Sequence, residues 1–195
     1  MCYHGQPQNL KAKPMSIPFL TIQCTSCSFR GSSLVTFGQF LWKHERQVFR
    51  MGRQMGLCED CNEIVAMERF PAPDVLERAR GLHAEYVGKP MDLYERDEAK
   101  DIARQKDLAV LERVMELNRP PVCLTCGGPN VKPVRIPRGV STKTTIPVCL
   151  GISHPWCGGL LMMEGSMGMR MGMNPVTKAY DIYGQLIMTV SEGPS

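Results

Sequence analysis

The chain lacks several features that would assign it to a common class of enzyme or membrane protein. No segment of it approaches the ~20 consecutive apolar residues that span a bilayer, so we expect no membrane contact. It also lacks a glycine-rich phosphate-binding loop, a His-Glu-x-x-His motif and a Gly-x-Ser-x-Gly motif, which mark nucleotide-binding, metalloprotease and serine-hydrolase sites. These absences favour a protein that is not an enzyme, without deciding the question.

Aromatic residues are scarce, at 7% of the 195 residues, whereas methionine occurs 14 times. A core built on flexible thioether side chains is weakly specified unless another kind of bond fastens it. Residues 1–20 also lack the continuous apolar run and the small-residue cleavage site of a secretory signal peptide. We therefore expect a reduced, cytoplasmic protein in which clustered cysteines bind metal rather than form disulfides.

What the chain has instead is nine cysteines, six of which form three Cys-x-x-Cys pairs. Random placement would give about 0.4 such pairs, so the pattern is not accidental. The pairs are Cys24/Cys27, Cys58/Cys61 and Cys123/Cys126, and a fourth segment, His154-Pro155-Trp156-Cys157, has the same length with histidine in the first position. A two-residue gap lets a tight turn aim both donor atoms at one tetrahedral zinc ion.

Spacing along the chain suggests how these four turns combine. The first two are separated by 30 residues and the last two by 27, so we expect each neighbouring pair of turns to share one ion. The expected ligands are Cys24, Cys27, Cys58 and Cys61 for a site of four cysteines, and Cys123, Cys126, His154 and Cys157 for a site of three cysteines and one histidine. Cys149 is the alternative to His154. Asn62, Gly127 and Gly158 follow a second ligand, where a positive φ frees N–H groups to point at sulfur.

Two such turns about 30 residues apart, each leading into a run of β-forming residues, resemble the zinc-ribbon family, or rubredoxin-knuckle class. The resemblance covers residues 21–69 and 121–165, roughly half of the chain. It implies two structural zinc ions per chain, each closed by four ligands. Zinc ribbons occur in polymerase subunits, transcription factors, ribosomal proteins and many enzymes, so the resemblance does not assign a function.

The sequence divides into four parts. We expect a flexible N-terminal arm over residues 1–20, a first zinc ribbon over 21–70, a helical linker over 71–120, and a second zinc ribbon with a methionine-rich β extension over 121–195. Residues 62–121 carry a net charge of −3, and the helical segment within them is either a spacer or the seam of a homodimer. The predicted fold class is therefore α+β, with two small β zinc ribbons joined by a charged helical segment.

The methionine-rich extension has a period of two. In a strand, this period places Met167, Met169, Met171 and Met173 on one face. Such a face either packs on an irregular surface, which thioethers do well, or binds Cu(I) through its soft sulfurs.

Positive charge gathers at the two cysteine-bearing ends, with +4 over residues 28–57 and +3 over residues 122–195. In the first segment Phe37, Phe40, Trp42 and Phe49 interleave with cations. This pattern suits either a nucleic-acid surface or a small core with a solvated cationic face. The candidate nucleic-acid contacts are Lys43, Arg46, Arg50, Arg53, Lys132, Arg135, Arg138 and Lys143.

Together these features predict a non-catalytic protein with two structural zinc ribbons, whose basic surfaces bind DNA or RNA within a larger assembly. The alternative is an adaptor between proteins of a multi-subunit complex that makes no contact with nucleic acid.

Overall fold

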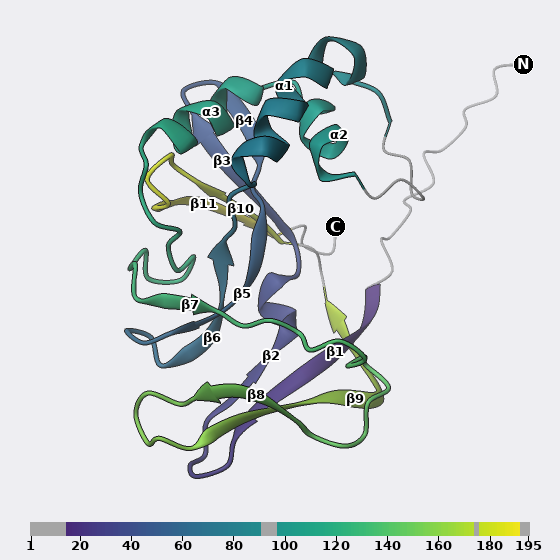
Figure 1. Cartoon of the computed structure of the whole chain (residues 1–195), viewed down its shortest axis with the longest axis vertical. Helices are drawn as coiled ribbons and strands as arrows, with labels where there is room; N and C mark the ends of the chain where they lie inside the picture. The colour runs from purple at the N-terminus through teal and green to yellow at the C-terminus, as the bar shows by residue number, and fades with distance from the viewer. Residues whose placement is uncertain (1–14, 91–96, 174–175, 192–195) are drawn as a thin grey trace, which may run out of the picture.

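The computed structural model describes residues 15–90, 97–173 and 176–191, with only the backbone given for 15–17 and 167–173. In this part of the chain the strands form three antiparallel or mixed sheets and the helices form one layer at an end of the molecule (Figure 1). This arrangement confirms the α+β class, with sheet as the larger component.

The three sheets are named here by their strands, in order across each sheet. Sheet A contains β2 (Arg30–Ser32), β1 (Met15–Cys24), β9 (Leu160–Met173) and β8 (Val148–Ser153). Sheet B contains β11 (Leu186–Ser191), β10 (Val176–Tyr180), β3 (Gln39–His44) and β4 (Gln47–Arg50). Sheet C contains β6 (Glu63–Glu68), β5 (Arg53–Cys58) and β7 (Val131–Pro133). A short 3-10 helix, η1 (Ser33–Thr36), joins sheet A to sheet B.

The chain visits these sheets in a nested order. It leaves sheet A after β2, passes through sheets B and C and the helices, and then returns to sheet C, sheet A and sheet B in turn. As a result β1 pairs with β9, and β5 pairs with β7. Each of sheets A and C therefore combines strands from both of the segments expected to fold as separate ribbons. β1 begins at Met15, so residues 15–20 are strand rather than arm, and residues 1–14 lie outside the described part.

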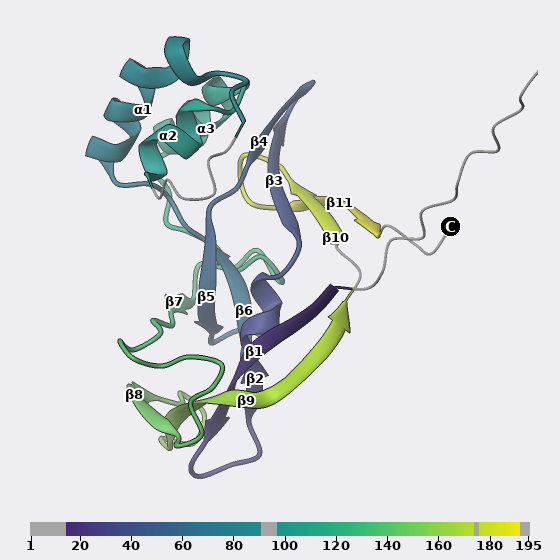
Figure 2. The ribbon, with the colours of Figure 1, turned by 90° about the vertical axis from the view of Figure 1, so that its right-hand side faces the viewer.

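Within residues 71–120, where a helical segment is expected, the described residues form three helices. They are α1 (Pro73–Tyr86), α2 (Glu98–Ala103) and α3 (Leu108–Glu116). They lie against the β3–β4 side of sheet B (Figure 2), where Leu76, Val110 and Leu111 belong to one buried apolar cluster with Phe40 and Trp42 of β3. The helices thus contribute apolar residues to the largest core. None of the described helices is both long enough and apolar enough to cross a bilayer.

A second core joins sheet A to sheet C. Ile22 of β1 and Leu161 of β9 pack against Met55 and Leu57 of β5. Gly31 permits the two sheets to approach, since a Cβ at this position would overlap the side chain of Ile64 in β6. The contact brings the turn after β5 close to the turns at the end of sheet A.

A buried ion pair ties sheet C to sheet B. Glu68, at the end of β6, is 0% exposed, and its two carboxylate oxygens accept from both Nη atoms of Arg119 at 2.5 and 2.8 Å. The same carboxylate accepts from Trp42 Nε1 at 2.9 Å and from the Val122 N–H at 3.1 Å. Arg119 in turn donates to the Ile182 carbonyl oxygen between β10 and β11. Because every partner is satisfied, the charge is tolerated in the interior.

The backbone of β9 confirms that the methionine-rich segment is a strand, which pairs with β1 as far as Met173. The side chains of Met167, Met169, Met171 and Met173 lie outside the described part, so neither interpretation of that face is tested.

Candidate metal centres

Two turns at one end of sheet A bring four donor atoms together. Cys24 ends β1 and Cys27 lies in the turn before β2, while His154 and Cys157 lie in the turn between β8 and β9. The antiparallel register pairs Cys24 with Leu161 and Ser153 with Leu160, so both turns lie at the same end of sheet A. We call this group of four residues the histidine site.

The donor atoms of the histidine site are spaced as a tetrahedral ion requires. Cys27 Sγ lies 3.4 Å and Cys157 Sγ 3.2 Å from His154 Nδ1, and the Sγ atoms of Cys24 and Cys157 are 3.4 Å apart. All four donors lie within 4.8 Å of one another. Ligands around tetrahedral zinc, at about 2.0–2.3 Å from the ion, are about 3.6–3.8 Å apart, so one ion fits with small adjustments.

Sheet C carries the second group, which we call the cysteine site. Cys58 ends β5 and Cys61 lies in the turn before β6, while Cys123 and Cys126 form the turn that precedes β7. The Sγ atoms of Cys58 and Cys126 are 3.7 Å apart, and those of Cys61 and Cys123 are 3.9 Å apart. These separations match tetrahedral coordination by four thiolates.

All eight expected ligands therefore occur in the two groups, but their expected combination is wrong. The sequence-based assignment joined Cys24/Cys27 to Cys58/Cys61, and Cys123/Cys126 to His154/Cys157. The structure instead joins the first turn to the fourth and the second to the third. The reason is the nested strand order, because each turn meets the turn on the strand that its own strand pairs with, not its neighbour in sequence.

Local backbone conformation shapes each turn as expected. Asn62, Gly127 and Gly158 all have positive φ, at 53°, 75° and 72°. Glycine adopts this region without strain, and asparagine is among the residues that tolerate it best. The N–H groups of Thr125 and Gly128 point at the sulfurs of Cys123 and Cys126, each at 3.4 Å. Such N–H groups stabilise thiolates at a metal site.

Burial works against thiolates when no cation is near. It raises the pKa of the Cys123 thiol to about 11 and moves the pKa of Cys61 upward as well, with the neighbouring thiols adding to the shift. In the histidine site the shifts go both ways: the N–H of Ser26 lowers the pKa of Cys24, whereas the pKa of Cys157 is raised to about 11. A divalent cation deprotonates a coordinating thiol outright, so metal binding would release protons from the buried cysteine site.

His154 is held by a residue in the turn that carries the other site. Its ring is 2% exposed and lies 4.4 Å from the ring of Phe29. Its Nε2 is 2.7 Å from Oδ1 of Asn62, the residue directly after Cys61. An amide oxygen can only accept, so Nε2 carries the proton and the lone pair of Nδ1 faces the sulfurs. This is the arrangement in which histidine binds a metal.

A second contact links the same two turns. The indole Nε1 of Trp156 approaches the carbonyl oxygen of Glu59 at 3.4 Å. The cysteine-site turn therefore contacts the histidine-site turn at two points. Cys149, the alternative ligand, is exposed on β8 and belongs to neither group.

The aromatic residues of the first basic segment are mainly core residues. Phe40, Trp42 and Phe49 are only 2%, 1% and 2% exposed, so they cannot stack on bases at the surface. Of the two interpretations of this segment, the structure supports a small core with cations around it.

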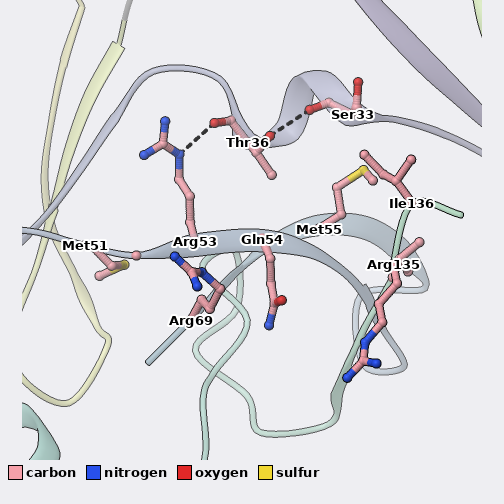
Figure 3. Close-up of a pocket in the computed structure, with 11 residues that line it drawn as sticks. Ser33, Thr36, Met51, Arg53, Gln54, Met55, Arg69, Arg135 and Ile136 are labelled. Atoms are coloured by element: carbon pink, nitrogen blue, oxygen red, sulfur yellow. Dashed lines mark hydrogen bonds between the residues drawn. The ribbon is translucent and has the colours of Figure 1, made fainter. Parts of the chain in front are cut away.

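The structure brings some of the predicted cations together. Arg53 and Arg135, from β5 and the segment after β7, line one recess together with Gln54 and Arg69 (Figure 3). Arg53 also lines a neighbouring recess with Arg50 and Lys106. Figure 3 shows the side chains of Gln54 and Arg135 on one side of β5 and that of Arg53 on the other, directed at Thr36.

Arg53 is fixed by the backbone. Its Nε donates to the Thr36 carbonyl and its Nη2 to the Gly38 carbonyl, both at 2.7 Å, and its guanidinium lies over the ring of Phe40. Burial, followed by the nearby Arg50 cation, lowers the pKa of Arg53, although a guanidinium remains charged at neutral pH.

The other candidate cations are scattered. Lys132 forms an ion pair with Glu59 at 2.6 Å, so its charge is partly neutralised. Lys43 and Arg46 lie at the β3–β4 hairpin, and Arg138 and Lys143 lie in the exposed segment before β8.

Sequence reasoning missed one residue that supports the histidine site and one buried ion pair of the core. Asn62 was expected only to adopt a positive φ, and its role as acceptor for His154 depends on contact between sheets. The Glu68–Arg119 pair has no local motif, because its members are far apart in sequence and meet only in the folded chain.

Comparison with family models, with curated proteins and with solved structures returned no match for this chain.

Proposed function

We propose that the chain binds two zinc ions in two structural zinc ribbons, one with the ligands of the histidine site and one with those of the cysteine site. The spacing of the two groups of four donors carries the proposal. Four protein ligands leave no coordination position for water or substrate, which is typical of structural rather than catalytic zinc. The donor set of thiolates and an imidazole suits zinc better than magnesium or calcium, which prefer oxygen.

Metal content tests this part of the proposal. The purified chain should contain two zinc ions, and a strong chelator should unfold it, since structural zinc supplies apparent binding free energies of about 10–16 kcal/mol in small domains. Zinc content by mass spectrometry and circular dichroism during chelation measure the two effects. An iron spectrum, or a chain that stays folded without metal, would contradict the proposal.

We further propose that this zinc-stabilised scaffold binds nucleic acid through the phosphate backbone. The support is the set of cations around the two recesses that share Arg53, in which Arg50 and Arg135 have no ion-pair partner among the described residues. Because the nearby aromatic residues are buried, binding should rest on charge rather than base stacking. We therefore expect little sequence preference and a strong dependence on salt.

Matched arginine variants test the nucleic-acid proposal. Replacing Arg50 and Arg135 together by alanine should weaken binding to DNA or RNA and reduce the slope of log K against log salt by about 2. Arg113→Ala is the control, because Arg113 lies on α3 and already pairs with Glu116 at 2.9 Å. If the unmodified, zinc-loaded chain binds no nucleic acid at low salt, this proposal fails while the zinc proposal stands.

A further inference from the structure

Strand β11 forms one edge of sheet B and exposes apolar side chains at four of its six positions. It pairs with β10 on one side. Leu186, Ile187, Met188 and Val190 are 53%, 52%, 45% and 45% exposed. An exposed apolar edge of this kind is a template for pairing with another strand.

The two edges of sheet B differ in how their backbone groups are treated. On β4, the opposite edge, the N–H of Val48 donates to Oδ2 of Asp107 and the N–H of Arg50 donates to Oε1 of Gln105, at 3.1 and 2.6 Å. Side chains from the segment between α2 and α3 therefore cap that edge. In the described part of the chain, no side chain caps β11 in this way.

The sequence of β11 also lacks the residues that usually protect an edge. Residues 182–191 include no charged side chain and no proline, whereas natural edge strands commonly carry lysine, proline or an inward-pointing charge. The one irregularity in pairing falls at Ile187, between Met188, which lies opposite Ala179, and Leu186, which lies opposite Tyr180; from Met188 to Ser191 the pairing with β10 is regular.

We propose that β11 pairs antiparallel with β11 of a second copy of this chain, so that two copies of sheet B form one continuous eight-stranded sheet. A two-fold axis makes this contact self-complementary, since the same strand serves both partners. With the axis at Thr189, Met188 lies opposite Val190 of the second copy. Met188 and Val190 share one face of the sheet, because they pair with Ala179 and Thr177 of β10.

The chemistry of the strand favours a second copy over nucleic acid or lipid. Nucleic acid and anionic lipid both require cations, and residues 182–191 have none. Because the segment is uncharged, two copies meet without like charges facing each other, which would otherwise oppose self-pairing. A pair of six-residue strands buries less than the ~1,600 Å² of a standard interface, so we expect a dimer that dissociates on dilution.

The test is sedimentation of the full, zinc-loaded chain over a wide range of concentration. We expect a monomer–dimer equilibrium that Met188→Lys weakens by about tenfold or more, because it places lysines close together across the two-fold axis. Val48→Lys is the matched control: Val48 is 46% exposed, close to the 45% of Met188, but lies on the capped edge. It should leave the dimer unchanged. Both variants should retain two zinc ions and the thermal stability of the parent chain.

Hydrogen exchange locates the contact independently. Amides of residues 186–191 should exchange more slowly at high than at low concentration, while those of α1–α3 should not change. A chain that remains monomeric at every concentration overturns the proposal and leaves the edge to a strand of another protein. A dimer that Met188→Lys does not weaken, or protection confined to the helices, overturns it as well.

Discussion

The contact between Asn62 and His154 predicts that a residue in the turn of the cysteine site supports zinc binding at the histidine site. The Oδ1 of Asn62 fixes the imidazole of His154 in the tautomer that presents Nδ1 to the ion. Asn62→Gly removes this acceptor and keeps the positive φ of 53° accessible without strain. The substitution therefore isolates the hydrogen bond from the turn conformation.

The magnitude follows from what such contacts contribute in other metal sites. Loss of a hydrogen-bond partner that orients a ligating histidine typically costs 10–100-fold in affinity, or about 1.4–2.7 kcal/mol. The histidine site should therefore bind zinc about 10–100-fold more weakly in Asn62→Gly. The cysteine site should change little, since Asn62 contributes no donor atom to it.

Competition with a chromophoric chelator measures the two affinities, and cobalt substitution identifies the site, because three thiolates with one imidazole absorb differently from four thiolates. Asn62→Asp is the control variant, since a carboxylate can accept the same proton from Nε2. Equal zinc affinities in Asn62→Gly and the parent chain would refute this role of Asn62. Selective loss of the four-thiolate spectrum would refute it too.

Three further predictions concern single side chains. His154→Ala should remove one zinc ion and Cys149→Ser none, as counted by native mass spectrometry, because only His154 lies among the donors. Arg119→Ala should lower the free energy of unfolding by about 3–5 kcal/mol in urea, since it leaves the carboxylate of Glu68 buried and unpaired. Burial raises the pKa of Tyr180 to about 12. The stabilisation from the protonated Tyr180 is therefore complete below the unfolded pKa of about 10 and is lost as pH rises toward 12. Tyr180→Phe should flatten the alkaline decline in melting temperature.

The ligands could be read from the sequence because their spacing is local. A two-residue gap in a tight turn is enough to identify Cys58 and Cys61 as a pair, and the positive φ at Gly127 and Gly158 follows from the same turn geometry. The helical segment expected within residues 71–120 depends on equally local patterns, and it occurs in the structure.

Which turns share a metal site could not be predicted from the sequence, because this depends on which strands pair. The pairing of β1 with β9 joins residues more than a hundred positions apart, and no local pattern encodes that choice. The same limit applies to Trp42: its place among cations looked equally suitable for a surface or a core. In the folded chain Trp42 is a core residue because the helices pack on sheet B.

The most direct test of the account is therefore a zinc count on two double variants. In Cys27→Ser with His154→Ala, both substitutions fall in the histidine site, so the chain should keep one zinc ion in the cysteine site. In Cys27→Ser with Cys61→Ser, each site loses a ligand, and we expect no tightly bound zinc. The opposite result, no zinc in the first variant and one ion in the second, would show that neighbouring turns share their ions and would contradict the nested arrangement.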